Sequence, residues 1–132
     1  FTFIGPLMNL KQNLAFTSFI SSCINSKKIV VHNKNTIRSY MYSTDLVNWL
    51  FNILIFSQSG SIYNVGSDEQ VTMETLSKKI ASYNQNIDIE DNSNDKVNMY
   101  VPSINKIKDE LDLKINIKLD ESIKRVMQYL SN

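Results

Sequence analysis

The stretch RSYMYSTDL, residues 38–46, decides the fold because it predicts a short strand that passes directly into a helix. Residues 38–42 alternate polar and apolar side chains loosely, as a short strand does. Ser43, Thr44 and Asp45 then offer N-caps for a helix that carries apolar residues from Leu46 onward. We interpret Asp45 as a cap or first-turn acid, and not as a catalytic carboxylate, because acids at a helix N-terminus stabilise the helix.

The residues before this stretch predict a strand, a helix and a second strand. Residues 1–4, FTFI, have the composition of a short buried strand, and Gly5-Pro6 ends it as a turn signal. Within residues 12–25 the apolar side chains recur every three or four positions, which predicts an amphipathic helix. The β-branched run at residues 28–32 predicts the next strand.

The residues after this stretch predict a strand at 61–65 and further helices that begin near Thr72, Ser103 and Asp120. Residues 84–96 are rich in Asn, Asp and Ser and are interpreted as a loop with a weak strand at 87–89. The chain therefore predicts an α/β fold of mixed short strands and four to five helices.

Composition and charge exclude several classes of function. The chain has 132 residues, 42% of them hydrophobic and 20% charged, which suits one domain. The net charge is +1 and no basic stripe is visible, so we expect no nucleic-acid partner. One cysteine, Cys23, and one histidine, His32, exclude a disulfide framework, a zinc site of ordinary ligands and a His-based triad. The longest apolar stretch, residues 46–56, is too short to span a bilayer, so we expect no membrane partner and a cytoplasmic location.

Four segments, taken in order, resemble one family and together cover nearly the whole chain. FTFIGP (1–6) is similar to a late strand of the extended short-chain dehydrogenases/reductases, which ends in Gly-Pro at the substrate cleft. RSYMYSTDL (38–46) resembles the family segment R-[DS]-Y-x-Y-x-x-D-L. YNVGS (63–67), followed by Val71-Thr72, resembles its [YF]-N-[IV]-G turn and next helix, and residues 102–123 resemble its closing pattern. The resemblance is to NAD-dependent epimerases/dehydratases, within the nucleotide-sugar 4-epimerase and 4,6-dehydratase group.

This resemblance implies that the two parts of the whole protein bind different molecules. In such enzymes an N-terminal Rossmann domain binds NAD(P) through a Gly-rich turn and carries a Tyr-x-x-x-Lys pair, and the C-terminal lobe holds the nucleoside-diphosphate sugar. Neither motif occurs here. Residues 1–132 thus resemble a single partial domain, the C-terminal substrate-binding lobe with the last strands of the Rossmann-type fold and without the N-terminal Rossmann core.

From the resemblance we expect a fragment of a lyase or isomerase of carbohydrate biosynthesis, inactive by itself. It would carry no catalytic, cofactor-binding or metal-binding residues, and NAD(P) would bind outside this chain. The partners implied are a nucleoside-diphosphate sugar and the missing N-terminal Rossmann domain, with a possible homodimer at full length.

The resemblance places four substrate-binding candidates at Arg38, Thr2, Tyr40 and Asn64. Arg38 matches the arginine that pairs with substrate phosphate, and a guanidinium fork suits phosphate oxygens on physical grounds too; the alternative is an exposed surface arginine. In an extended segment Tyr40 and Tyr42 would point to the same face as Arg38, although ordinary core aromatics are the alternative. Asn64 is first a turn residue and second a ligand contact. Thr2 stands where many family members have a substrate-contacting Asn.

Departures from the family pattern keep other interpretations open. His32-Asn33-Lys34 replaces the common Gly-Asp-Gly, and residues 91–96 lack the R-x-G-D motif, for which Lys96 is a candidate substitute. A non-catalytic nucleotide-sugar-binding or protein-interaction module on the same fold is the main alternative function. A generic α/β domain with chance matches is a third, and the acidic residues at 88–95 are interpreted as solvated rather than as a metal site.

Overall fold

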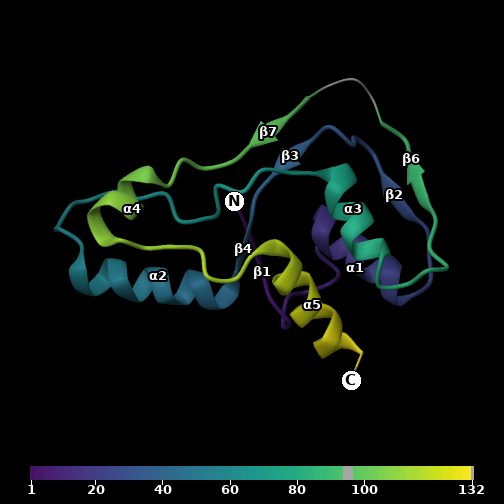
Figure 1. Cartoon of the computed structure of the whole chain (residues 1–132), viewed down its shortest axis with the longest axis horizontal. Coiled ribbons are helices and arrows are strands. Elements are labelled where there is room, and N and C mark those ends of the chain that lie inside the picture. The colour runs from purple at the N-terminus through teal and green to yellow at the C-terminus, as the bar shows by residue number, and fades with distance from the viewer. Residues whose placement is uncertain (94–96, 132) are drawn as a thin grey trace.

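The computed structural model describes residues 1–93 and 97–131 as short strands interleaved with helices (Figure 1). The helices are α1 (Ala15–Ile24), α2 (Ser43–Phe56), α3 (Met73–Ala81), α4 (Asn105–Leu111) and α5 (Leu119–Leu130). The strands are β1 (Thr2–Ile4), β2 (Ile29–Val31), β3 (Ile37–Arg38), β4 (Tyr40–Tyr42), β5 (Val71–Thr72), β6 (Ile89–Asp91) and β7 (Met99–Tyr100). This arrangement confirms the predicted α/β fold class with its mixed short strands.

The strand predicted at residues 38–42 is two strands that belong to different sheets. β3 lies between β5, which is antiparallel to it, and β7, which is parallel. β4 instead pairs in parallel with β1, with Thr2 opposite Tyr40 and Ile4 opposite Tyr42. The chain changes sheet at Ser39, which is buried, and such a change of partner leaves no mark on local apolar periodicity.

The other strand predictions need three corrections. Residues 61–65 form no strand, while β5 and β7 were not predicted, because two-residue strands are defined by their neighbours and not by local pattern. The weak strand expected at 87–89 lies at Ile89–Asp91, where it pairs in parallel with β2. The buried strand expected at residues 1–4 is buried only at Ile4; Phe1 and Phe3 are 40% and 39% exposed.

The sequence predicted where the helices start to within a few residues, but it named the wrong capping residue for three of them. Thr72 caps α3 as predicted, because its Oγ1 accepts a hydrogen bond from the Thr75 backbone N–H at 3.0 Å. Ser43 lies inside α2, whose N-cap is Tyr42, and Asp120 lies inside α5, whose N-cap is Lys118. Ser103 precedes the N-cap of α4, Ile104. None of these three helices has a side-chain cap, so those predictions are wrong.

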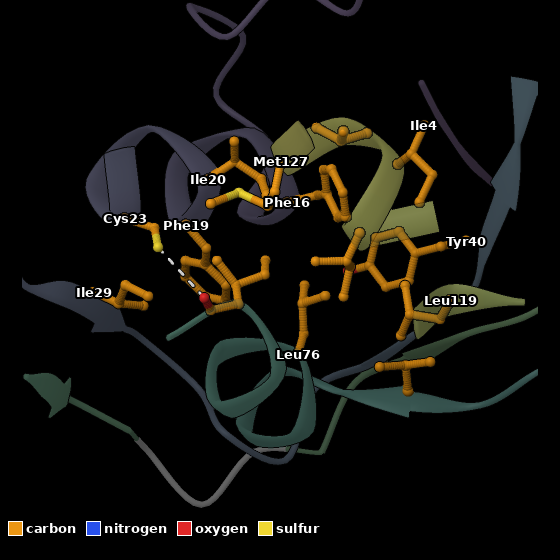
Figure 2. Close-up of a cluster of buried hydrophobic side chains, with 14 of the residues drawn as sticks. Ile4, Phe16, Phe19, Ile20, Cys23, Ile29, Tyr40, Leu76, Leu119 and Met127 are labelled. Atoms are coloured by element: carbon orange, nitrogen blue, oxygen red, sulfur yellow. Dashed lines mark hydrogen bonds between the residues drawn. The ribbon is translucent and has the colours of Figure 1, made fainter. Parts of the chain in front are cut away.

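Two hydrophobic clusters hold these elements together. The larger joins side chains of α1, α3 and α5 with those of β1, β2 and β4, and Figure 2 shows Phe16, Leu76 and Met127 converging in it. The smaller lies between α2 and the C-terminal segment and contains Met41 and Trp49 with residues of the α4 region. Successive residues of β4 point to opposite faces, so this strand divides its side chains between the two clusters. No described helix is both long and apolar enough to cross a membrane.

Candidate functional site

Arg38 is a half-buried cation held by neutral oxygens. Its Nη1 donates to the backbone oxygens of Ile37 and Asn98, at 2.8 and 3.1 Å, and to the Asn98 Oδ1 at 3.1 Å. Among residues 1–93 and 97–131, no carboxylate lies within ion-pair distance of this guanidinium. Arg38 is therefore positioned by its neighbours while its charge stays uncompensated, which is the state that favours binding of an anion.

Thr2 and Tyr40 lie side by side, because the parallel register of β1 and β4 places them opposite each other. Tyr40 is only 5% exposed, and its ring packs against Phe16 with centroids 5.8 Å apart. Burial raises the pKa of the Tyr40 hydroxyl well above its usual range, and the charge of Arg38 opposes that shift. Tyr40 thus takes the core position that was the alternative interpretation, while Thr2 remains half-buried.

Asn64 lies on the long connection between α2 and β5 and is exposed. Its Nδ2 donates to the backbone oxygen of Ser103 at 3.0 Å, which ties this connection to the segment before α4. Gly66 follows closely, and a Cβ at Gly66 would lie 3.0 Å from the Pro102 ring and 3.4 Å from Phe1. The connection therefore reaches the start of β1, and the hydrogen bond of Asn64 fits its first interpretation as a turn residue.

An open hollow of about 350 Å³ lies along the flank of α1 and β2. Thr36, two residues before Arg38, lines it. Its wall mixes polar groups, including Ser18 and His32, with apolar ones such as Phe19. A hollow with an apolar wall and a few convergent polar groups suits a small organic ligand.

This hollow was not predicted from the sequence, although the sequence contains a signal for it. Lys28, Val30 and His32 alternate along β2 and its flanks, and all three line the hollow. Residues at i, i+2 and i+4 of a strand share one face. The run was interpreted only as a buried strand, so its second face was not considered.

A second, larger hollow of about 730 Å³ lies at the carboxyl ends of β1 and β4. Gly5 and Pro6 line it together with Ser43 and Thr44 of the first turn of α2. A Cβ at Gly5 would come within 2.6 Å of the Ser43 Oγ, so only glycine lets β1 leave the sheet this close to α2. The turn predicted at Gly5-Pro6 agrees with this geometry, since β1 ends at Ile4.

Asp45 is a buried carboxylate with a structural task. It is 3% exposed and accepts hydrogen bonds from the backbone N–H groups of Asn116 and Ile117 at 3.0 and 2.9 Å. Its other oxygen accepts from the Asn116 Nδ2 at 3.1 Å. Asp45 lies in the first turn of α2, as expected, but it also joins that helix to the connection between α4 and α5.

The remaining reactive groups considered from the sequence are Cys23 and the acidic residues near β6. Cys23 is buried, its Sγ donates to the Ile80 backbone oxygen at 3.4 Å, and burial raises the pKa of its thiol (Figure 2). No group of three or more His, Cys, Asp or Glu residues able to hold a metal ion occurs among the residues described. Asp91 pairs with Lys34, and Lys96 lies outside the described residues.

Comparison with known proteins identifies relatives among nucleotide-sugar enzymes. UDP-glucuronic acid decarboxylase 6 of Arabidopsis thaliana is 28% identical over 127 residues, which cover 93% of this chain and 37% of that protein. dTDP-D-glucose 4,6-dehydratase of Dictyostelium discoideum is 38% identical over 64 residues, 47% of this chain and 14% of that protein. No family model matches the sequence.

The fold matches solved structures of the same kind. UDP-glucuronic acid 4-epimerase of Bacillus cereus, solved with NAD and a UDP-linked fluorosugar, superposes on 99% of this chain and 43% of its own with a TM-score of 0.82 and 16% identity. These findings confirm the sequence-based recognition of the NAD-dependent epimerase/dehydratase family. The chain spans well under half the length of the relatives it matches.

NAD is the cofactor of the solved relative, and the residues described here do not form a site for it. The chain has three glycines: Gly5 after β1, Gly60 after α2 and Gly66 before β5. A pyrophosphate site needs a glycine-rich turn that leads from a strand into a helix. α2 does follow β4 directly, but without a glycine between them. We therefore derive no chemical step through the cofactor for this chain.

Proposed function

We propose that this chain is the substrate-binding part of an NAD-dependent nucleotide-sugar epimerase, dehydratase or decarboxylase, and that Arg38 binds the diphosphate of the sugar nucleotide. The single observation that carries the proposal is the uncompensated, half-buried guanidinium of Arg38 on β3, between β5 and β7. A phosphate needs a charge that no protein carboxylate already neutralises, and Arg38 meets that condition among the described residues.

The surroundings of Arg38 suit the rest of such a ligand. The hollow that Thr36 lines, two residues before Arg38, offers an apolar wall for a planar ring and polar side chains for its hydrogen bonds. Thr2, on β1, adds one hydroxyl opposite Tyr40, which follows Arg38 by two residues. In this arrangement the chain binds and orients the sugar nucleotide, and remote binding of the diphosphate positions the reacting carbon for groups supplied elsewhere.

Three finer points belong to the same proposal. The whole enzyme is a lyase or isomerase, since the named relatives include a dehydratase, a decarboxylase and an epimerase. It acts in the cytoplasm, and residues 1–132 are a single partial domain of it. The chain by itself turns over no substrate, because its sequence contains neither a Gly-rich turn nor a Tyr-x-x-x-Lys pair.

The test is titration of the chain with UDP-glucose and dTDP-glucose by calorimetry, repeated with Arg38→Ala and Arg38→Lys. Charged hydrogen bonds contribute about 1.5–3 kcal/mol, so Arg38→Ala should weaken binding by roughly 10- to 150-fold. Arg38→Lys keeps the charge but loses the fork, so it should recover only part of that affinity. Arg125→Ala is the matched control, since this arginine pairs with Glu121 on the exposed face of α5.

Unchanged affinity in Arg38→Ala would remove the assigned role. Binding of neither sugar nucleotide by the wild-type chain would favour the protein-interaction alternative.

A further inference from the structure

We propose that the ring of Tyr100 is the surface on which the sugar ring of the nucleotide sugar stacks, and that Tyr100 thereby distinguishes a nucleotide sugar from the free nucleotide. This inference rests on the proposed function, because it places the sugar relative to the diphosphate that Arg38 binds. Tyr100 contributes affinity for the sugar in this arrangement and supplies no group that makes or breaks a bond.

Tyr100 lies directly beside Arg38 on the neighbouring strand. The parallel register of β3 and β7 places Arg38 opposite Tyr100. Residues opposite each other in neighbouring strands lie on the same face of the sheet, and the strands are about 4.8 Å apart. β7 lies at one side of the sheet β5-β3-β7, so no described strand of this sheet lies beyond Tyr100. A group attached to a phosphate on Arg38 therefore reaches Tyr100 without crossing another strand.

The Tyr100 ring is exposed but held in place. Tyr100 is 56% exposed, and the ring of Phe1 stacks on its ring with centroids 5.1 Å apart and planes inclined by 23°. Figure 1 shows the N-terminus close to β3 and β7, which agrees with this contact. Stacking covers one face of the Tyr100 ring, so its exposure comes from the other face and the ring edge. The open face is therefore available to a ligand.

Arg38 keeps two of its three guanidinium nitrogens for a ligand. Its hydrogen bonds within residues 1–93 and 97–131 all leave from Nη1. Nη2 and Nε therefore retain donors for phosphate oxygens, and a guanidinium presents these donors in one plane as a fork. A diphosphate bound there carries the nucleoside on one end and the sugar on the other, so two places are needed beside Arg38.

The distances from Arg38 assign the base to the hollow that Thr36 lines and the sugar to Tyr100. Thr36 is two residues away along the chain, which is about 7 Å when extended, whereas Tyr100 is one strand spacing away. The described residues that line this hollow do not include Tyr100. In a nucleotide sugar the sugar is bonded directly to the diphosphate, while ribose separates the base from it. The shorter reach therefore belongs to the sugar.

The chemistry of a pyranose ring suits an exposed tyrosine ring that is fixed from behind. A pyranose presents C–H groups on its faces and hydroxyl groups around its rim. The face of an aromatic ring carries partial negative charge, which attracts the slightly positive C–H groups. The hydroxyl groups stay in water at the rim, so stacking on Tyr100 leaves them hydrated and costs little desolvation.

The test compares two ligands, UDP-glucose and UDP, which differ only in the sugar. Calorimetry measures both affinities for the wild-type chain and for Tyr100→Ala, Tyr100→Phe, Arg38→Ala and Tyr129→Ala. Tyr129 is the matched control, because it is a tyrosine of similar exposure, 50%, on α5. Proton NMR of bound UDP-glucose gives a second measurement, since protons that lie over an aromatic ring shift upfield.

We expect Tyr100→Ala to weaken UDP-glucose binding by about fivefold, within the range for an aromatic stacking contact, and to leave UDP binding within about twofold. Tyr100→Phe keeps the ring, so both affinities should stay within about twofold of the wild-type values. The glucosyl C–H protons should shift upfield on binding to the wild-type chain and not on binding to Tyr100→Ala. Tyr129→Ala should change neither affinity.

An equal loss of UDP and UDP-glucose affinity in Tyr100→Ala would overturn the inference, because Tyr100 would then contact the nucleotide or support the fold. Unchanged UDP-glucose affinity in this variant would overturn it as well. Arg38→Ala separates the two proposals, since it should weaken both ligands alike through the shared diphosphate. A loss in Arg38→Ala without a selective loss in Tyr100→Ala refutes this inference alone, and the reverse refutes only the role of Arg38. Binding of neither ligand by the wild-type chain refutes both.

Discussion

Replacing Asp45 with alanine should weaken the whole fold, because this carboxylate holds the connection between α4 and α5 against the start of α2. The side chain accepts three hydrogen bonds at 2.9–3.1 Å, two of them from the backbone N–H groups of Asn116 and Ile117. A hydrogen bond to a charged group contributes about 1.5–3 kcal/mol, and removing the acceptor leaves part-buried donors without this partner.

The three bonds do not add, because the carboxylate also loses hydration on burial. We therefore expect Asp45→Ala to lower the free energy of unfolding by about 3 kcal/mol, and Tm by roughly 10 °C for a domain of this size. The measurement is urea and thermal denaturation followed by far-UV circular dichroism. Asp109→Ala is the control, since this exposed aspartate on α4 should change stability by less than about 0.5 kcal/mol.

Hydrogen exchange makes the reasoning specific to this contact. In Asp45→Ala the amides of Asn116 and Ile117 should exchange faster under native conditions than the amides within α1. If Asp45→Ala unfolds within about 0.5 kcal/mol of the wild-type chain, the carboxylate does not hold the connection and the argument is refuted.

Two further outcomes follow from contacts near β1 and β4. Gly5→Ala should cost about 1–3 kcal/mol in urea denaturation, because the new Cβ would lie 2.6 Å from the Ser43 Oγ, and Ser43→Gly in the same chain should restore most of the loss; no rescue would show that the strain lies elsewhere. Burial raises the pKa of Tyr40, so the folded state keeps this proton after the unfolded chain has lost it, and stability should fall as pH rises through about 10. Denaturation of Tyr40→Phe between pH 8 and 11 should show a shallower fall, by up to about 1.4 kcal/mol per pH unit; an unchanged slope would contradict the assignment.

Features that depend on nearby residues were predictable from the sequence. The spacing of three and four between Phe16, Phe19, Ile20 and Cys23 predicted α1, since helix periodicity is a property of one segment. The same holds for the cap at Thr72, whose partner lies three residues away. The order of the family-like segments predicted the fold class, because they carry the turns and strand ends that fix the chain path.

Features that depend on distant residues were not predictable in the same way. The two-residue strands β5 and β7 exist because β3 lies between them, and their hydrogen bonds join residues some thirty to sixty positions apart. The role of Asp45 depends on Asn116, 71 residues later, so its local pattern suggested only a helix start. The hollow beside α1 likewise joins residues of α1, β2, α3 and their adjoining turns, none of which is unusual by itself.

By itself the sequence determined the class of fold and the choice of Arg38 as the anion-binding candidate, because these depend on residue type and local spacing. The tertiary structure decided that Tyr40 belongs to the core, that Arg38 keeps its charge free of any described carboxylate and that α2 presents an apolar face to the outside. The burial of a side chain and the compensation of its charge depend on its neighbours in the folded chain. Those neighbours are often distant in the sequence, so a local pattern does not reveal them.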